Sequence, residues 1–219
     1  MRLTRLALYR TVIFCDDSGS MEFDDRFQNQ LALVSRIARI ATMIVPDDEA
    51  GVDLRFINGE GLDKLNANAV EQAMKAVDPK GGTPIGTSLR SKILEPLVYK
   101  FIPTGSLKRP VLVCIITDGS PSGELPDVFV KAILECKQNL IAAKYDPESV
   151  TFLVSQIGSD EFAKDFLESL RAEKDIKTVL HCTTDRLDDK FRELKEKEDG
   201  LDLWLLKLLT KPLFNRHEE

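Results

Sequence analysis

The sequence predicts an α/β fold in which a doubly wound, mostly parallel sheet carries helices on both faces. Segments rich in β-branched residues alternate with stretches of helical length along the 219 residues, and this alternation is typical of parallel strands joined by crossover helices. The strongest strand, residues 110–116, shows no polar alternation, so we expect it at the centre of the sheet with both faces covered. Polar loops follow two strong strands, which points to a site at the carboxyl edge of the sheet.

Composition narrows the class of protein. Hydrophobic residues make up 43% of the chain and charged residues 30%, as in ordinary globular proteins. The formal net charge is −6, so the broad basic footprint of a nucleic-acid-binding protein is missing, although a local patch stays open. No apolar run approaches the roughly 18 residues that span a bilayer. We therefore expect neither nucleic acid nor a membrane span.

The N-terminal residues 1–15 are expected to form the first strand. A signal peptide is the alternative, but Arg10 interrupts the apolar run and no small-residue cleavage site follows. The four cysteines show no metal-binding spacing. We expect them to be buried free thiols in a reducing compartment, which predicts a cytoplasmic (intracellular) protein.

Five further elements are expected before the central strand. Apolar residues recur at helical spacing from Phe27 to Ile44, where Pro46 and acidic residues follow. A strand breaks at an Asn-Gly turn, and Pro84 suits the first turn of a helix. In chain order, the segments are a helix at 27–44, a strand at 52–57, a helix at 68–77, a loop at 78–84 and a helix from Pro84 toward Pro96.

Beyond the central strand the alternation continues. Its expected elements are a helix at 126–144, a strand at 150–157, a helix from 158–160 to Arg171, a strand at 178–182 and a charged helix at 187–198. The segment after Gly200 has a wide apolar arc with Asp202, Lys207 and Lys211 on its polar side. We expect one domain over residues 1–183 and a C-terminal helical extension over 184–219. This extension packs on the domain or on a partner or lies on a membrane surface.

Oxygen-bearing side chains follow the strands. Asp16, Ser18 and Ser20 lie on one tight loop after an apolar run, Thr83 lies on a glycine-rich loop, and Asp118 follows the central strand. Taken alone, the first loop is equally typical of a helix N-cap. If the first strand neighbours the central strand, Asp16 and Asp118 face one another at the crevice where doubly wound folds bind ligands.

The donor set indicates a hard cation. Two carboxylates and three hydroxyls suit Mg²⁺ first and Mn²⁺ next. No histidine or cysteine belongs to the set, which disfavours zinc. Hydroxyls are neutral ligands, so the cation keeps net positive charge and attracts an acidic oxygen from outside. Asp17 adds charge beside the site or, as we expect, faces solvent.

Three segments together resemble the von Willebrand factor A domain and its metal-ion-dependent adhesion site. In chain order, they are the Asp16-x-Ser18-x-Ser20 loop, residues 81–89 (Gly-Gly-Thr-Pro-Ile-Gly-Thr-Ser-Leu) and residues 116–119 (Ile-Thr-Asp-Gly). The resemblance covers about residues 9–183. It implies a Rossmann-like sheet with one short antiparallel edge strand, which would fall at 59–66.

The resemblance also implies roles for the five residues. Ser18 and Ser20 would bind the metal directly, and Thr83 would do so in the ligand-competent state. Asp16 and Asp118 would act mainly through waters or switch between direct and indirect contact. The absence of a signal or spanning segment suggests an intracellular member of the family, and such members generally serve as docking parts of larger assemblies. By analogy with the family, ligand binding would swap Asp118 and Thr83 between direct and water-mediated positions, and movement of the final helix could follow.

The expected function is a binding module and not an enzyme. It would recognise a protein partner that offers an Asp or a Glu to the bound cation. The alternative is a Mg²⁺-dependent phosphohydrolase at the same site, with Lys80 as the nearest phosphate clamp. No nucleophile elbow, phosphate-binding loop or dinucleotide fingerprint is present. His181 is expected to be a partly buried strand residue and not a base, and the oligomeric state stays open.

Overall fold

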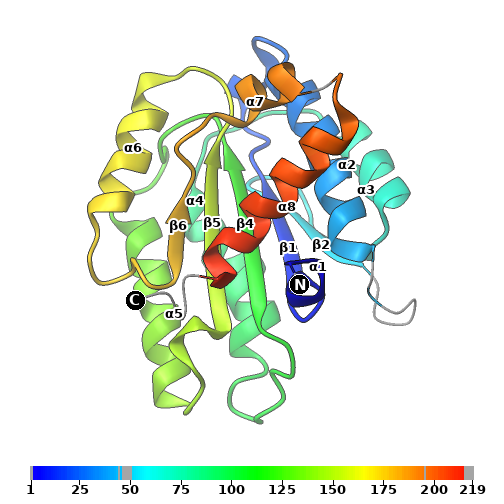
Figure 1. Ribbon diagram of the computed structural model, residues 1–219. Helices are drawn as coiled ribbons and strands as arrows, with labels where there is room; N and C mark the ends of the chain where they lie inside the picture. Colours follow the sequence, from blue (N-terminus) through cyan, green and yellow to red (C-terminus); the bar gives the residue numbers. More distant parts are fainter. Residues whose placement is uncertain (1, 44, 46–50, 195, 215–219) are drawn as a thin grey trace.

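The computed structural model describes residues 2–43, 45, 51–194 and 196–214. A six-stranded sheet with the order β3-β2-β1-β4-β5-β6 forms its centre (Figure 1). Its strands are β1 (Arg10–Cys15), β2 (Val52–Phe56), β3 (Leu62–Leu65), β4 (Val111–Thr117), β5 (Val150–Gln156) and β6 (Leu180–Cys182). Neighbouring strands are parallel except β2 and β3, which are antiparallel. The predicted doubly wound sheet and its short antiparallel edge strand are confirmed.

Helices surround the sheet. They are α1 (Arg2–Leu6), α2 (Arg26–Thr42), α3 (Ala67–Lys75), α4 (Ile85–Leu89), α5 (Val128–Ala142), α6 (Glu161–Ala172), α7 (Leu187–Leu194) and α8 (Glu198–Phe214), with short 3₁₀ turns η1 (Gly19–Glu22) and η3 (Pro147–Ser149) and a π-helix η2 (Arg90–Tyr99). The expected positions Ile44, 46–49 and His217 lie outside the described residues.

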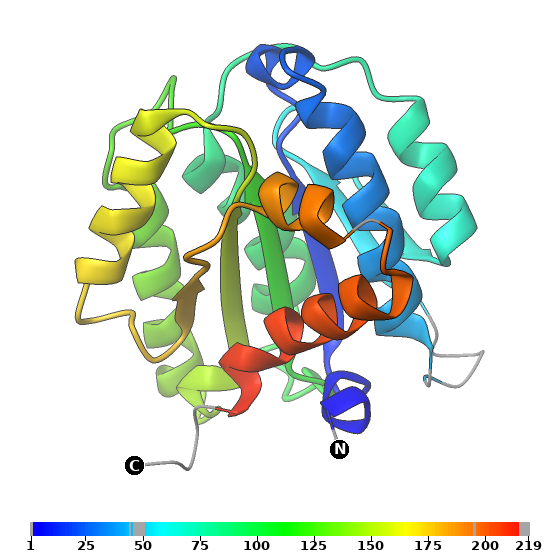
Figure 2. The same cartoon turned by 45° about the horizontal axis from the view of Figure 1, so that its top comes forward.

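Each face of the sheet has its own apolar core. On one face, strand residues such as Phe14 and Ile115 pack against α4, η2, α5 and α6. On the other face, their chain neighbours Ile13 and Cys114 pack against α1, α2, α3, α7 and α8 (Figure 2). All seven residues of β4 are buried. A strand buried on both faces cannot alternate with polar residues, which explains its sequence.

The order of the strands reverses at β1, with β2 and β3 added on one side of it and β4, β5 and β6 on the other. Strand β1 pairs with β2 on one side and with β4 on the other. In the second pair Cys15 lies opposite Ile116, and the backbone N–H of Asp16 donates to the carbonyl of Ile116 at 2.9 Å. The crevice between these strand ends is therefore the switch point at which doubly wound folds bind ligands.

Two elements differ from the sequence-based expectation. The first residues form the short helix α1 before β1, because Leu6 is buried against the second core and does not extend the sheet. The helix after Pro84 does not stop at Pro96 but continues through it as η2. Proline lacks the N–H of an α-helical bond, and the π-helical bond from Lys100 N–H to the carbonyl of Glu95 shows that the turn is wider here.

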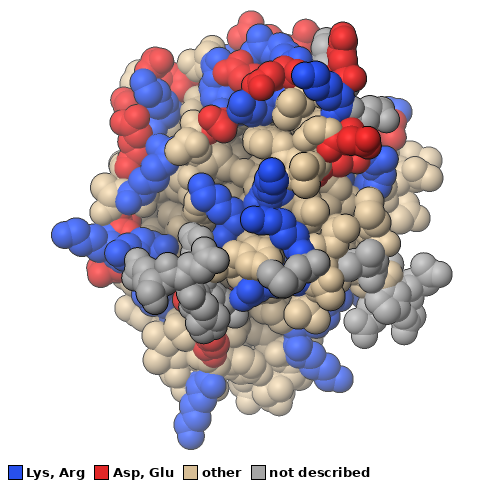
Figure 3. All heavy atoms as spheres, in the orientation of Figure 1, with Lys and Arg blue, Asp and Glu red and all other residues tan. Residues whose placement is uncertain are grey.

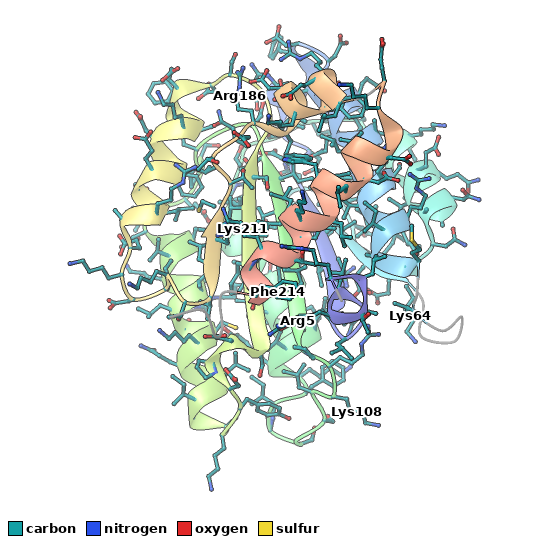
Figure 4. All side chains as sticks on the ribbon, in the orientation of Figure 1. Arg5, Lys64, Lys108, Arg186, Lys211 and Phe214 are labelled. Atoms are coloured by element: carbon teal, nitrogen blue, oxygen red, sulfur yellow. The ribbon has the colours of Figure 1, made fainter. Side chains whose placement is uncertain are left out.

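The C-terminal helix α8 packs on the domain. Leu201, Leu205, Leu209 and Leu213 recur every four residues and are fully buried. Around its last turn, the guanidinium of Arg5 lies 4.8 Å from the centroid of the Phe214 ring, and the two residues are side by side in Figure 4. The division of the chain at residue 183 stays a prediction. Among the described residues, no helix is both long and apolar enough to cross a bilayer.

Candidate metal centre

The loop after β1 turns its polar groups inward. The Asp16 side chain is fully buried, and its carboxylate accepts hydrogen bonds from the Ser18 backbone N–H at 2.9 Å and from the Thr117 hydroxyl at 2.6 Å. The hydroxyl oxygens of Ser18 and Ser20 lie 3.1 Å apart. The carboxylate thus holds the loop in a tight turn that places the two serine hydroxyls side by side.

Asp118 joins this group from the end of β4. One of its carboxylate oxygens accepts a hydrogen bond from the Ser20 hydroxyl at 2.9 Å. The other oxygen pairs with a guanidinium nitrogen of Arg26 at 2.7 Å. Because Thr117 bonds Asp16 and the next residue bonds Ser20, four of the five predicted residues form one hydrogen-bonded cluster.

Thr83 lies on a third loop beside the cluster. The Gly19 N–H donates to the carbonyl of Gly81 at 3.1 Å, which joins this loop to the first. Gly81 has a φ of +85°, and a Cβ there would stand 2.9 Å from the Asn58 side-chain oxygen, so glycine is required. Thr83 itself is buried and hydrogen-bonds through its backbone to Ser122, with its N–H donating to the Ser122 hydroxyl at 2.8 Å.

The expectation that Asp17 faces solvent is wrong. Its side chain is buried, and its carboxylate accepts hydrogen bonds from the backbone N–H groups of Asn58 at 2.7 Å and Gly59 at 2.8 Å. The ammonium of Lys92 holds the same turn by donating to three carbonyls, those of Phe56, Ile57 and Gly59, at 2.7–2.9 Å. Asp17 therefore anchors the first loop to the turn after β2.

Two side chains of this site were missed from the sequence. Arg26 begins α2, where the helix macrodipole disfavours a cation, and this unusual position was the available signal of an acidic partner. Glu124 accepts hydrogen bonds from the N–H groups of Gly86 and Thr87, both at 2.8 Å, and so covers the N-terminus of α4. It ties the loop of Thr83 to the loop of Asp118.

Burial dominates the electrostatics of Asp16. It raises the pKa of this carboxyl from its ordinary value of 3.8 to about 6, and the Asp118 charge adds to the rise, while the bonds from Ser18 and Thr117 oppose it. Both hydrogen-bond partners are neutral, so the buried charge lacks an ion pair. Such a group is costly unless a cation joins it, and the hydroxyl and carboxylate oxygens around it are ligands that divalent cations prefer. The residues therefore fit a divalent cation.

Other kinds of metal site find less support. In the described part of the chain, no group of three or more His, Cys, Asp and Glu residues could hold a metal ion. The candidate centre depends on hydroxyls instead. His181 lies in β6, is half-buried as expected, and takes no part in the cluster.

Comparison with known proteins rests on structure. No protein-family model matches the chain, and no curated protein matches it in sequence. Proximal thread matrix protein 1 from the mussel byssus is 19% identical with a TM-score of 0.52 and 90% of this chain covered. One structure of that protein is described as having a zinc-occupied adhesion-site motif. A von Willebrand factor type A protein from Catenulispora acidiphila is 21% identical, with a TM-score of 0.50 over 88% of this chain.

A manganese-loaded TRAP protein from Plasmodium vivax is 14% identical, with a TM-score of 0.54, and the match covers 89% of this chain and 74% of that one. The chain spans about half the length of the byssus and Catenulispora proteins, namely 48% and 42%. At these identities the likeness establishes the fold.

Proposed function

Because this chain has the fold of a von Willebrand factor A domain, we propose that it is a divalent-cation-dependent protein-binding module. Asp16, Ser18, Ser20, Thr83 and Asp118 hold the cation, with Mg²⁺ as the first candidate and Mn²⁺ as the second. The observation that carries this proposal is the fully buried Asp16 carboxylate, whose hydrogen-bond partners are neutral, beside a second carboxylate and two hydroxyls at the switch point of the sheet.

The ligand chemistry favours capture of an acidic group. When bound, the cation supplies a positive charge and an exchangeable position that accepts a carboxylate oxygen from a partner. Three of the five proposed ligands are neutral hydroxyls, which do not reduce that charge. The Asp17 carboxylate is turned away to the Asn58 and Gly59 amides and does not fill the position.

The surroundings suit a protein partner. Phe23, Leu125 and Phe162 are 63%, 68% and 73% exposed. They lie on the segments that follow β1, β4 and β5, at the edge of the sheet that carries the centre. Exposed aromatic and large aliphatic side chains near a polar site are typical of protein-binding surfaces. We infer that the partner offers an Asp or Glu flanked by apolar residues.

Other functions have weaker support. A phosphohydrolase needs a cationic side chain that is held at the site and free to bind phosphate. Arg26 is held there but is paired with Asp118, and Lys80 extends into solvent. Hydrolysis of p-nitrophenyl phosphate with Mg²⁺ or Mn²⁺ that is lost in Asp16→Ala would favour that alternative. Nucleic acid is disfavoured by the net charge of −6 and by the mixture of acidic and basic side chains at the upper end of the face in Figure 3.

An intracellular location is part of the proposal. All four cysteines are buried and unpaired, and burial raises the pKa of the Cys114 and Cys136 thiols to about 12. Buried free thiols of this kind suit a reducing compartment. Nuclear magnetic resonance shifts of the cysteines, or thiol labelling of the unfolded protein isolated from cells, would show whether the four thiols are reduced.

Calorimetry tests the cation site. Mg²⁺ and Mn²⁺ are titrated into metal-free protein, beside Asp16→Ala, Thr83→Ala and a control, Asp146→Ala, which alters an aspartate cap before β5 at the opposite edge of the sheet. We expect one-site binding that is lost in Asp16→Ala, weakened in Thr83→Ala and unchanged in the control. Equal binding by all four proteins, or no binding by folded wild type even when acetate is present, would contradict the proposal.

Recognition is tested with peptides. An array of randomised peptides with a fixed central Glu is compared with the same array carrying Gln, in Mg²⁺ and after chelation. We expect binding only with Glu and only in Mg²⁺. Binding that survives both the Gln change and chelation would show that another surface recognises partners.

A further inference from the structure

Arg26 is a built-in cation at the candidate metal centre. Its guanidinium contacts Asp118 at 2.7 Å and Asp24 at 3.2 Å. The Arg26 side chain is only 14% exposed, and that of Asp118 is fully buried. The Nε atom of Arg26 is buried without a hydrogen-bond partner. A positive side chain held this deeply beside a predicted ligand changes what that ligand offers to a metal ion.

Packing keeps the guanidinium in place. Gly158, which follows β5, has a φ of +75°, and a Cβ there would stand 2.8 Å from the Arg26 Nε. The guanidinium therefore fits between the Asp118 carboxylate and a position at which a side chain would collide with it. Arg26 begins α2, and the buried residues of α2 form much of the core on that face of the sheet. The packing of this helix therefore holds Arg26 beside Asp118.

Charge at the centre follows directly. The buried carboxylates of Asp16 and Asp118 together with Arg26 carry a net charge of −1. The sum leaves out Asp24, whose side chain is 76% exposed and screened by solvent, and Asp17, whose carboxylate faces the Asn58 and Gly59 amides. A dication changes the sum to +1. Without Arg26 the same three positions and the dication would be neutral. Arg26 thus opposes the entry of the cation and makes the loaded centre one charge unit more positive than it would be without this residue.

We propose that Arg26 sets the selectivity of this centre: it weakens binding of the free divalent cation and strengthens binding of a carboxylate ligand to the loaded centre. This rests on the proposed function and extends it. The cation and the acidic ligand then bind cooperatively, because each supplies the charge that the other needs. A charge 4–6 Å from an ionised group shifts its proton-binding equilibrium by about tenfold or more, and the same charge repels a dication with twice the energy with which it repels a proton.

The test measures two equilibria with opposite expected signs. Mn²⁺ is titrated into the protein and followed by the electron paramagnetic resonance signal of free Mn²⁺, with and without acetate at constant ionic strength. We expect Arg26→Gln to bind Mn²⁺ at least about tenfold more tightly than wild type. We also expect acetate to tighten Mn²⁺ binding in wild type and to do so much less in Arg26→Gln.

Controls separate charge from position. Arg39→Gln removes the same charge from the same helix, at a residue paired with Asp202 of α8, and should match wild type. Arg26→Lys should keep most of the acetate effect. Arg26→Met, which keeps an apolar stem in the buried space, is the second neutral variant in case Arg26→Gln does not fold, and circular dichroism checks each protein.

Three outcomes separate the two proposals. Tighter Mn²⁺ binding with a smaller acetate effect in the neutral variants supports the role of Arg26. Mn²⁺ binding that needs Asp16 but is equal or weaker in both neutral variants overturns that role and leaves the proposed function standing. If folded wild type binds no Mn²⁺ with or without acetate, both proposals fall.

Discussion

The buried charge of Asp16 leads to an unusual expectation, namely that its removal stabilises the metal-free protein. Asp16→Asn deletes the charge and keeps the shape of the side chain. The rise of the Asp16 pKa from 3.8 to about 6 corresponds to about 3 kcal/mol of unfavourable free energy in the folded state when the carboxyl is ionised. Loss of the carboxylate acceptor for Ser18 or Thr117 offsets about 1 kcal/mol of this stabilisation. The net gain at pH 8 is about 1–2 kcal/mol.

The sign depends on pH in a defined way. Because the folded pKa of Asp16 lies above the unfolded value, the folded state binds more protons between about pH 4 and 6. This group therefore lowers wild-type stability as pH rises through that range. The advantage of Asp16→Asn should be full above pH 7, shrink as pH falls through 6, and disappear as pH approaches 4, where the unfolded carboxyl is protonated as well.

Urea unfolding in a chelator and in saturating Mg²⁺ measures the effect. In the chelator at pH 8 the variant should be the more stable protein. In Mg²⁺ the order should reverse, because a ligand at 100 times its Kd stabilises wild type by about 2.7 kcal/mol and the variant does not bind it. Asp53→Asn is the matched control: Asp53 is also buried but pairs with Arg10 at 2.5 Å, so its loss should destabilise the fold by about 2–4 kcal/mol. Equal destabilisation by both variants in the chelator would refute the reasoning.

Three further predictions follow from other contacts. Lys92→Met removes the ammonium that donates to three carbonyls of one turn, so urea unfolding should show a loss of about 2–4 kcal/mol, and an unchanged midpoint would show that the carbonyls find other donors. Phe23→Ser and Leu125→Ser should each weaken the affinity for a Glu-containing peptide found on the array by about tenfold. Ile141→Ser, at an exposed position of α5, should leave the affinity unchanged. Equal effects of all three changes would show that Phe23 and Leu125 do not form the binding surface. Burial, with the nearby lysine and arginine charges, lowers the pKa of His181 from 6.5 to about 4. Stability that is present above pH 6.5 is therefore lost as pH falls toward 4, by about 1–2 kcal/mol for this partly exposed ring. His181→Gln should flatten that loss in acid denaturation curves, and an unchanged curve would contradict this prediction.

The main features of the fold were predictable because buried positions must be occupied by apolar residues, and their spacing along the chain differs between strands and helices. β4 is apolar throughout since both of its faces are covered, and the antiparallel edge strand fell where the resemblance placed it. The site loops came together because parallel strands end at one edge of a sheet. The adjacency of β1 and β4 was left as a condition at the sequence level, and the structure shows these two strands paired.

The missed features depend on contacts between distant residues. Nothing local to Asp17 shows that two N–H groups from residues more than forty positions away will surround it. The pairing of Arg26 with Asp118 likewise spans 92 positions. Helix η2 passes through Pro96 although proline normally ends a helix, because packing of Leu97 and Val98 in the core outweighs local preference. The local sequence pattern was enough to identify candidate site residues, but their hydrogen-bond and ion-pair partners depend on contacts between distant segments.

The central claim is that one divalent cation binds at the loop ends of β1 and β4. Anomalous diffraction from crystals grown with Mn²⁺ locates such an ion directly. We predict one strong peak within bonding distance of the Ser18 and Ser20 hydroxyls and close to Asp118, and no such peak in crystals of Asp16→Ala. Ordered Mn²⁺ elsewhere with this position empty, or a peak that persists in Asp16→Ala, would contradict the account.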